Sequence, residues 1–121
     1  MKNVLDLVLK KKWYDMIESG EKTEEYREIK PYWEKRLVDY KAIQKDIKAI
    51  MVRKFLIGRN RFDPCREYPR GYEKVTFHLG YAKDRPTMTF ELKDITIGQG
   101  KVDWGAEEGK SYFIIHIGKR L

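Results

Sequence analysis

The apolar residues of one late segment change phase, and this feature limits the folds open to the chain. Met88, Phe90 and Leu92 occupy even positions. Ile95 and Ile97 occupy odd positions. Because successive side chains of a strand point to opposite faces, all five share a face only if one extra residue lies between Leu92 and Ile95. Such a residue is a β-bulge, which bends the strand as the closing of a small barrel requires.

The other strands are predicted from short apolar runs and from a two-residue alternation. Apolar residues stand at alternate positions from Val75 to Tyr81, as in a strand that buries one face. The remaining predicted strands cover residues 4–9, 23–28, 48–57 and 112–117. For residues 48–57 the periodicity alone also allows a helix. In the last strand both alternating faces are apolar enough to be at least partly covered.

A helix is predicted over residues 10–19. Trp13, Met16 and Ile17 have the i, i+3 and i+4 spacing that gives a helix one apolar face. Gly20 follows at the position where a left-handed residue commonly ends a helix.

A second helix is predicted to begin at Pro31 and to run to about Lys41. Trp33, Leu37 and Tyr40 lie on it at helical spacing. Two N-terminal helices, five or six strands and no repeating β-α pattern predict an α+β fold with a mixed sheet curled into a barrel. At 121 residues, the chain is expected to form one domain over residues 1–121.

The charge balance is basic. The chain has 26 lysine and arginine residues against 19 aspartate and glutamate residues, a net charge of +7. This balance favours an anionic partner such as RNA, DNA or a nucleotide. The alternative is a basic surface that keeps the protein soluble and has no partner.

The cysteine content and the N-terminal segment bear on the compartment. A single cysteine, Cys65, excludes an internal disulfide and fits a reducing cytoplasm. The first apolar stretch is short and is interrupted by Asp6, so we expect neither a signal peptide nor a membrane span. We therefore expect a soluble, cytoplasmic protein without a membrane partner.

A dense group of ionisable residues follows the first helix. Lys22, Glu24, Glu25 and Arg27 stand at the start of a predicted strand, where the backbone is well fixed, and their side chains are expected to converge. A lysine and a carboxylate in a partly dry cleft shift each other's proton affinity. The group is therefore a candidate polar site. The alternative is an ion-pair network that braces the strand.

Gly20, Lys22 and Arg27 carry a family resemblance. Their spacing resembles the G-x-K-x-x-x-x-R hallmark of the ASCH domain, which lies within a PUA-like β-barrel. The order of helices and strands agrees, so the resemblance implies a PUA-like barrel with two N-terminal helices over the whole chain. It also implies RNA binding in a cleft beside the motif. Some small bacterial members look like amidohydrolases acting on N4-acylated cytidine, and the position of their threonine nucleophile is occupied here by Glu25.

The resemblance assigns roles to the motif residues. Lys22 and Arg27 are expected to contact a phosphate or a base carbonyl. Glu25 is expected to accept a hydrogen bond from an exocyclic amine or to orient Lys22, and Lys10 and Lys11 add positive charge nearby. The rival prediction is an enzyme, an amidohydrolase on modified nucleosides or a ribonuclease, with Lys22 and Glu25 as the proton-transfer pair. A third prediction is a protein-interaction module that binds a peptide in the same cleft.

A second basic group lies in a long predicted loop after residue 57. Its arginines are interleaved with aromatic residues, and the prolines and a glycine within the same stretch mark it as a loop. Guanidinium groups bind phosphates and aromatic rings stack bases, so the loop is a candidate nucleic-acid arm. The alternative is a solvated loop whose aromatic residues lie on the barrel. The arginines predicted to bind the ligand are Arg59, Arg61, Arg66 and Arg70.

No metal or cofactor is predicted from the sequence. His78 and His116 fall in predicted strands, without a cysteine or carboxylate at the spacing of a metal site. Trp104 lies in a glycine-flanked loop and is a candidate to close over a ligand.

Overall fold

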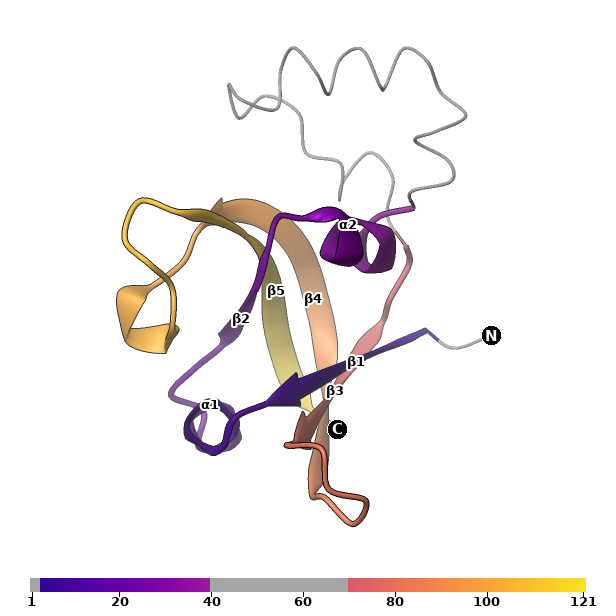
Figure 1. Cartoon of the computed structure of the whole chain (residues 1–121). Helices are drawn as coiled ribbons and strands as arrows, with labels where there is room; N and C mark the ends of the chain where they lie inside the picture. The colour runs from indigo at the N-terminus through magenta and orange to yellow at the C-terminus, as the bar shows by residue number, and fades with distance from the viewer. Residues whose placement is uncertain (1–2, 40–69) are drawn as a thin grey trace.

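The computed structural model describes residues 3–39 and 70–121, which form two helices and a five-stranded mixed sheet (Figure 1). In chain order the elements are β1 (Val4–Leu9), α1 (Lys11–Glu18), β2 (Glu24–Glu28), α2 (Pro31–Leu37), β3 (Lys74–Leu79), β4 (Thr87–Gln99), a 3₁₀ turn η2 (Val102–Trp104) and β5 (Ser111–Arg120). The strand order is β1-β3-β4-β5-β2. The chain is therefore an α+β fold, as the sequence predicts.

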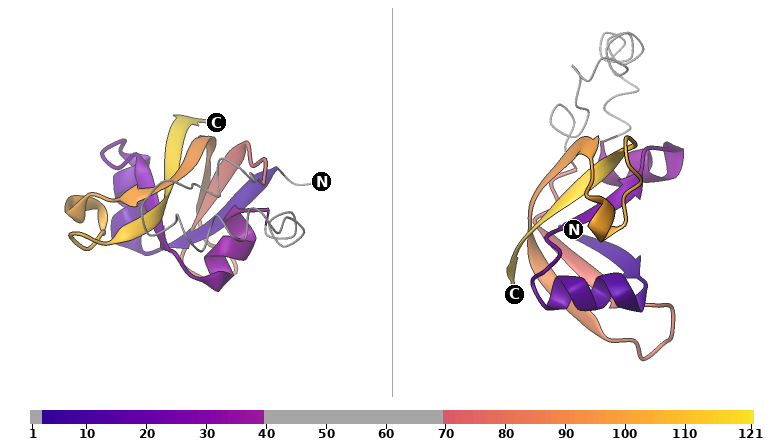
Figure 2. Two further views of the ribbon diagram at one scale, coloured as in Figure 1. Left: turned by 90° about the horizontal axis from the view of Figure 1, so that it is seen from above. Right: turned by 90° about the vertical axis from the view of Figure 1, so that its left-hand side faces the viewer.

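The sheet is curved into half a barrel. β1 is parallel to β3, and the other neighbouring pairs are antiparallel. The long strands β4 and β5 bend so that the two edge strands, β1 and β2, lie on the same side of the sheet (Figure 2). Figure 1 shows α1 and α2 at the two ends of β2.

The predicted bulge is confirmed. The pairs on either side of it are Phe90 with Arg120, Leu92 with Ile117, and Asp94 with His116. The register therefore shifts twice. The first shift, between Phe90 and Leu92, adds an extra residue to β5, and the second, between Leu92 and Asp94, adds an extra residue to β4. Met88 and Phe90 before the bulge, and Ile95 and Ile97 after it, thereby all contact the same core cluster.

The core fills the concave side of the sheet. Alternate residues of β1 and β3 are buried there, including Leu5, Leu7, Val75 and Phe77. β5 is covered on both faces, as predicted: Phe113 and Ile115 belong to this core, whereas Tyr112 and Ile114 belong to a second cluster on the other face.

Helix α1 lies close to its predicted position, but its buried face is rotated. Tyr14 and Ile17 are buried, whereas Trp13 and Met16 are half-buried. The side chain of Trp13 contacts a polar cluster, described below, and not the core. Gly20 adopts a φ of 86°, the left-handed conformation predicted to end the helix.

Two predicted boundaries are wrong. Helix α2 ends at Leu37 and not near residue 41, because Val38 is already extended (φ −126°, ψ 151°). Strand β3 ends at Leu79, and Tyr81, predicted to lie inward, is 86% exposed on the turn that follows. The predicted strand at 48–57 lies outside the described residues. No helix among the described residues is long and apolar enough to cross a membrane.

The loop over residues 100–110, called here the 100–110 loop, covers the outer face of β2 and β5. Ala106 and Trp104 pack with Tyr26, Tyr112 and Ile114. The phenolic hydroxyl of Tyr26 accepts a hydrogen bond from the backbone N–H of Lys101 at 2.9 Å. The loop is thus tied to β2 immediately beside the polar motif.

We predict that Gly100→Ala loosens this contact. A Cβ at Gly100 would lie 2.7 Å from two ring carbons of Tyr26 and 2.8 Å from the Cβ of Ala106. Overpacking of this kind costs about 1–3 kcal/mol of the free energy of unfolding, to be measured by urea denaturation. Gly98→Ala is the matched control, because its Cβ would meet only Ile114 Cδ1 at an ordinary 3.4 Å. Equal losses in the two variants would contradict the tight packing.

Candidate functional site

The faces of β2 decide which ionisable residues meet. Glu25 lies opposite Ile115 and Arg27 lies opposite Phe113, and both partners are fully buried in the core. Because residues opposite each other in a sheet share a face, Glu25 and Arg27 point to the concave side. Glu24 points to the other face, so the expected convergence of all four residues is wrong for Glu24.

Glu24 takes part in a separate polar group on the outer face. Its Oε1 accepts a hydrogen bond from the Tyr26 hydroxyl at 2.7 Å, and its Oε2 lies 3.6 Å from His116 Nδ1. His116 Nε2 lies 2.8 Å from Thr96 Oγ1. Burial, the largest cause, together with the hydrogen bond to Glu24, raises the pKa of Tyr26 far above its usual value.

Lys22 is buried at the foot of β2. Its side chain turns inward after the left-handed turn at Gly20, and the residue is only 2% exposed. Its Nζ donates to Glu25 Oε1 at 2.6 Å and to the carbonyl oxygen of Trp104 at 2.9 Å. The ammonium also lies 4.6 Å from the ring centroid of Trp13. A buried ammonium needs such partners to offset its lost hydration.

Glu25 joins this lysine to Arg27. Its Oε2 forms an ion pair with Nη2 of Arg27 at 2.8 Å, while Oε1 holds Lys22. Nη2 of Arg27 also donates to the carbonyl oxygen of Val8 at 3.2 Å. A continuous polar chain, called here the Lys22–Glu25–Arg27 chain, therefore connects the 100–110 loop, β2 and β1.

A second arginine reinforces the edge of β1. The carbonyl oxygens of Asn3 and Leu9 accept hydrogen bonds from backbone N–H groups on the β3 side. Because the carbonyls of successive strand residues point to opposite sides, those of the even-numbered residues of β1 face the edge that has no neighbouring strand. Two of these even carbonyls are bound by side chains: Val8 by Arg27 at 3.2 Å and Asp6 by Arg36 at 3.0 Å. Guanidinium groups thus occupy hydrogen-bonding positions that a neighbouring strand would take.

The indole of Trp33 in α2 holds both guanidinium groups. The guanidinium carbons of Arg27 and Arg36 each lie 5.1 Å from its ring centroid. The spacing of Trp33 and Arg36 in one helix, three residues apart, places both on the same helix face. Trp33 was predicted to lie on this helix from its spacing, whereas Arg36 was not predicted; the signal for the pair was the i, i+3 spacing of an aromatic residue and a cation.

Three hollows formed by the described residues meet at Arg27. The first, called here the aromatic hollow, has a volume of about 410 Å³ and is lined by Val8, Leu9, Lys10, Trp13, Glu25, Arg27, Gly80 and Tyr81. The second, the basic hollow, has about 440 Å³ and is lined by Asp6, Leu7, Val8, Arg27, Lys30, Tyr32, Trp33, Arg36 and Tyr81. The third, of about 290 Å³, lies on the other side of Arg27 and Trp33, toward the 100–110 loop.

The remaining predicted ligand residues are more scattered. Lys10 is exposed and lines the aromatic hollow. Lys11 is exposed, pairs with Asp15 at 2.8 Å and lines none of these three hollows. Gly20 supplies the turn before Lys22. Arg59, Arg61 and Arg66 fall in the part of the chain that is not described.

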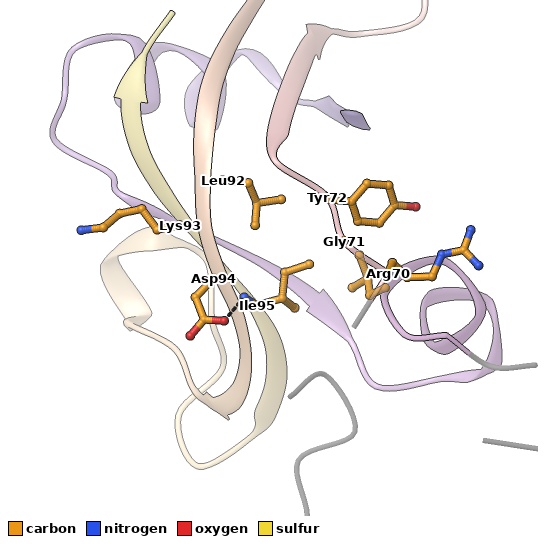
Figure 3. Close-up of a pocket in the computed structure, with 8 residues that line it drawn as sticks. Arg70, Gly71, Tyr72, Leu92, Lys93, Asp94 and Ile95 are labelled. Carbon is orange, nitrogen blue, oxygen red and sulfur yellow. Dashed lines mark hydrogen bonds between the residues drawn. The ribbon is translucent and has the colours of Figure 1, made fainter. Parts of the chain in front are cut away.

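Arg70 belongs to a different depression. It lies beside the bulge of β4, in a small pocket of about 130 Å³ with Leu37, Tyr72, Leu92 and Ile95 (Figure 3). Arg27 and Glu25 do not line this pocket. The predicted union of Arg70 with the motif residues in one site is therefore not seen in the described residues.

Trp104 and the histidines are held by internal contacts. Trp104 offers its backbone carbonyl to Lys22, and its ring packs in the outer cluster beneath Lys101, whose Nζ lies 4.2 Å from the ring centroid. His78 Nε2 lies 2.9 Å from Asp6 Oδ1. Within residues 3–39 and 70–121 no three His, Cys, Asp or Glu residues are grouped as a metal site.

Comparison with known proteins gives no relative. A scan against protein-family models, a search of curated proteins and a search of solved structures each returned no match.

The burial of Lys22 predicts a dependence of stability on pH. Burial, the largest cause, lowers the pKa of Lys22 below 10.5, against the opposing attraction of Glu25. Between the lowered value and 10.5 the unfolded chain holds a proton that the folded protein has released. By linkage, the free energy of unfolding of the wild type therefore rises with pH across this window, relative to that of Lys22→Met.

Urea denaturation of both proteins from about pH 7 to about pH 10 measures this difference. Lys11→Met is the control, because Asp15 raises the pKa of the exposed Lys11, and any change from it falls above 10.5. A wild-type to Lys22→Met difference that stays constant, or that falls as the pH rises, would show that burial does not shift Lys22 in this direction.

Proposed function

We propose that the chain is an ASCH-type domain with a PUA-like barrel, which binds RNA or a nucleotide-like ligand in the hollows around Arg27. The motif spacing of Gly20, Lys22 and Arg27 supports this proposal. The half-barrel sheet is compatible with it. The aromatic and basic lining of the hollows provides the chemistry that single-stranded nucleic acids use, stacking for bases and cations for phosphates.

The observation that carries the proposal is the position of Arg27. Arg27 lines all three hollows, and its guanidinium is fixed by Glu25, by the Val8 carbonyl and by the Trp33 ring. A cation held in this way loses little conformational freedom on binding, which favours affinity. A planar guanidinium is also suited to bind a phosphate or a base carbonyl through paired N–H groups.

Lys22 has a supporting role in this proposal. It lines none of the three hollows, and its Nζ is already bound by Glu25 and by the Trp104 carbonyl. The ammonium of Lys22 holds Oε1 of Glu25, which leaves Oε2 turned toward Arg27. Glu25 lines the aromatic hollow and accepts a hydrogen bond from an amino group of the ligand.

The second candidate function is an enzyme acting on acylated nucleosides or on RNA. The lowered pKa of Lys22 beside a carboxylate favours it, because a lysine of this kind is suited to proton transfer. The depth of Lys22 disfavours it, since a general base must reach the proton that it removes. Hydrolysis of N4-acetylcytidine, or cleavage of RNA, by the wild type but not by Glu25→Gln would establish this function instead.

Binding of a short single-stranded RNA tests the proposal. Lys10→Gln and Arg27→Gln each remove a cation from the hollows, and we expect affinity to fall about tenfold for Arg27→Gln, because hydrogen bonds to charged groups are among the strong ones. The affinity of the wild type falls with salt, and each variant that loses a phosphate contact shows a slope smaller by about 0.7. Fluorescence anisotropy at several salt concentrations measures both quantities.

Lys119→Gln is the matched control, since Lys119 is exposed on β5 and lines none of the three hollows. Circular dichroism establishes that each variant is folded. If Lys119→Gln weakens binding as much as Lys10→Gln and Arg27→Gln do, binding is a general effect of the basic surface and the site is wrong. If the wild type binds neither RNA nor nucleotides at low salt, the proposed function is wrong.

A further inference from the structure

The aromatic hollow and the basic hollow differ in chemistry. Trp13 and Tyr81 provide rings in the aromatic hollow, beside the aliphatic side chains of β1, and Glu25 provides one acceptor. The basic hollow contains Arg27, Lys30 and Arg36 against a single acid, Asp6. The carboxylate of Asp6 lies 2.9 Å from His78 Nε2. One hollow therefore suits a planar ring, and the other suits an anion.

The two hollows are adjacent. They share Val8, Arg27 and Tyr81 as lining residues, so a single ligand can occupy both. Tyr81 is 86% exposed on the turn between β3 and β4, and it is a lining residue of both hollows. An exposed aromatic side chain at such a position provides a stacking surface at little cost in conformational entropy.

The cations of the basic hollow have unused donors. Among the described residues Arg27 bonds through Nη2, which leaves Nη1 as a donor for a ligand; Nε also lacks a partner there but is buried. Lys30 is half exposed, and the distance between its Nζ and Glu28 Oε1 is long, at 3.9 Å. An anion between Lys30 and Arg27 can therefore bind without breaking the Lys22–Glu25–Arg27 chain.

We infer that the recognised unit is a nucleotide with a phosphate monoester, its base in the aromatic hollow between Trp13 and Tyr81 and its phosphate in the basic hollow at Arg27 and Lys30. The inference rests on the proposed function and specifies its ligand. It separates the phosphate from the base, so that each half of the ligand depends on different side chains. The same chemistry is present in a free mononucleotide and in the phosphorylated end of an RNA strand.

Isothermal titration calorimetry with adenosine, cytidine, their 5′-monophosphates and inorganic phosphate tests the inference. Of the two monophosphates, we expect the one that binds the wild type more tightly to bind about tenfold more tightly than its own nucleoside. Lys30→Gln reduces this ratio several-fold and leaves the affinity for the nucleoside unchanged. Tyr81→Ala weakens binding of the nucleoside and of the monophosphate by a similar factor. Lys119→Gln is the control and changes neither.

The outcomes separate this inference from the proposed function. A nucleoside and its monophosphate that bind with equal affinity would overturn the inference and leave the proposed function standing. Inorganic phosphate that binds as tightly as the monophosphate would overturn it as well, since the base would then contribute nothing. A monophosphate preference that Lys30→Gln leaves intact would place the phosphate elsewhere.

Titration of an RNA strand with and without a 5′-terminal phosphate distinguishes the two sources of the ligand. A strand that binds more tightly with the phosphate, by a factor that Lys30→Gln reduces, identifies the strand end as the ligand. A mononucleotide that binds while both strands bind equally identifies the free nucleotide. If no nucleoside, nucleotide or RNA binds, the proposed function and this inference both fail.

Discussion

The buried ion pair between Lys22 and Glu25 is the interaction on which the rest of the site depends. Moving two charges out of water costs several kcal/mol for each ion, and only close geometry with further hydrogen bonds offsets this cost. The protein supplies both, with an Nζ–Oε1 distance of 2.6 Å, the Trp104 carbonyl on one side and Arg27 on the other. To satisfy the pair, the 100–110 loop, the end of α1 and strand β2 must be held together. The ion pair therefore fixes the walls of the hollows as well as the orientation of Arg27.

The location of the Lys22–Glu25–Arg27 chain follows from the open side of the sheet. β1 and β2 are the two edges, and edge strands leave backbone groups without a neighbouring strand. In β1 two such carbonyls are bound by Arg27 and Arg36, whose guanidinium groups contact Trp33. Arg27 on the inner face of β2 and Arg36 on α2 thus perform two tasks. They cover the edge with hydrogen-bond donors, and they line the space that remains between the edges with cations.

Much of the fold was predictable because it depends on local periodicity. The phase change between Leu92 and Ile95 predicts the bulge, and Gly20 predicts the end of α1; both are present. The separation of Glu24 from Glu25 was also accessible, since neighbouring residues of a strand point to opposite faces. The contact of Trp33 with Arg27, that of Arg36 with β1 and the place of Tyr81 in the hollows were not, because they join elements far apart in the sequence. The end of α2 was missed because Tyr40 continues a helical spacing that the backbone has already left at Val38.

A double-mutant cycle of stability tests the central claim most directly. The free energies of unfolding of the wild type, Lys22→Met, Glu25→Gln and the double variant are measured by urea denaturation at neutral pH. Each single variant is expected to lose about 3–5 kcal/mol, because a buried charge is left without its partner. The double variant is expected to lose less than the sum, with a coupling energy of about 1–3 kcal/mol. Losses that add to within about 0.3 kcal/mol would show that the two charges do not depend on each other and would contradict this account.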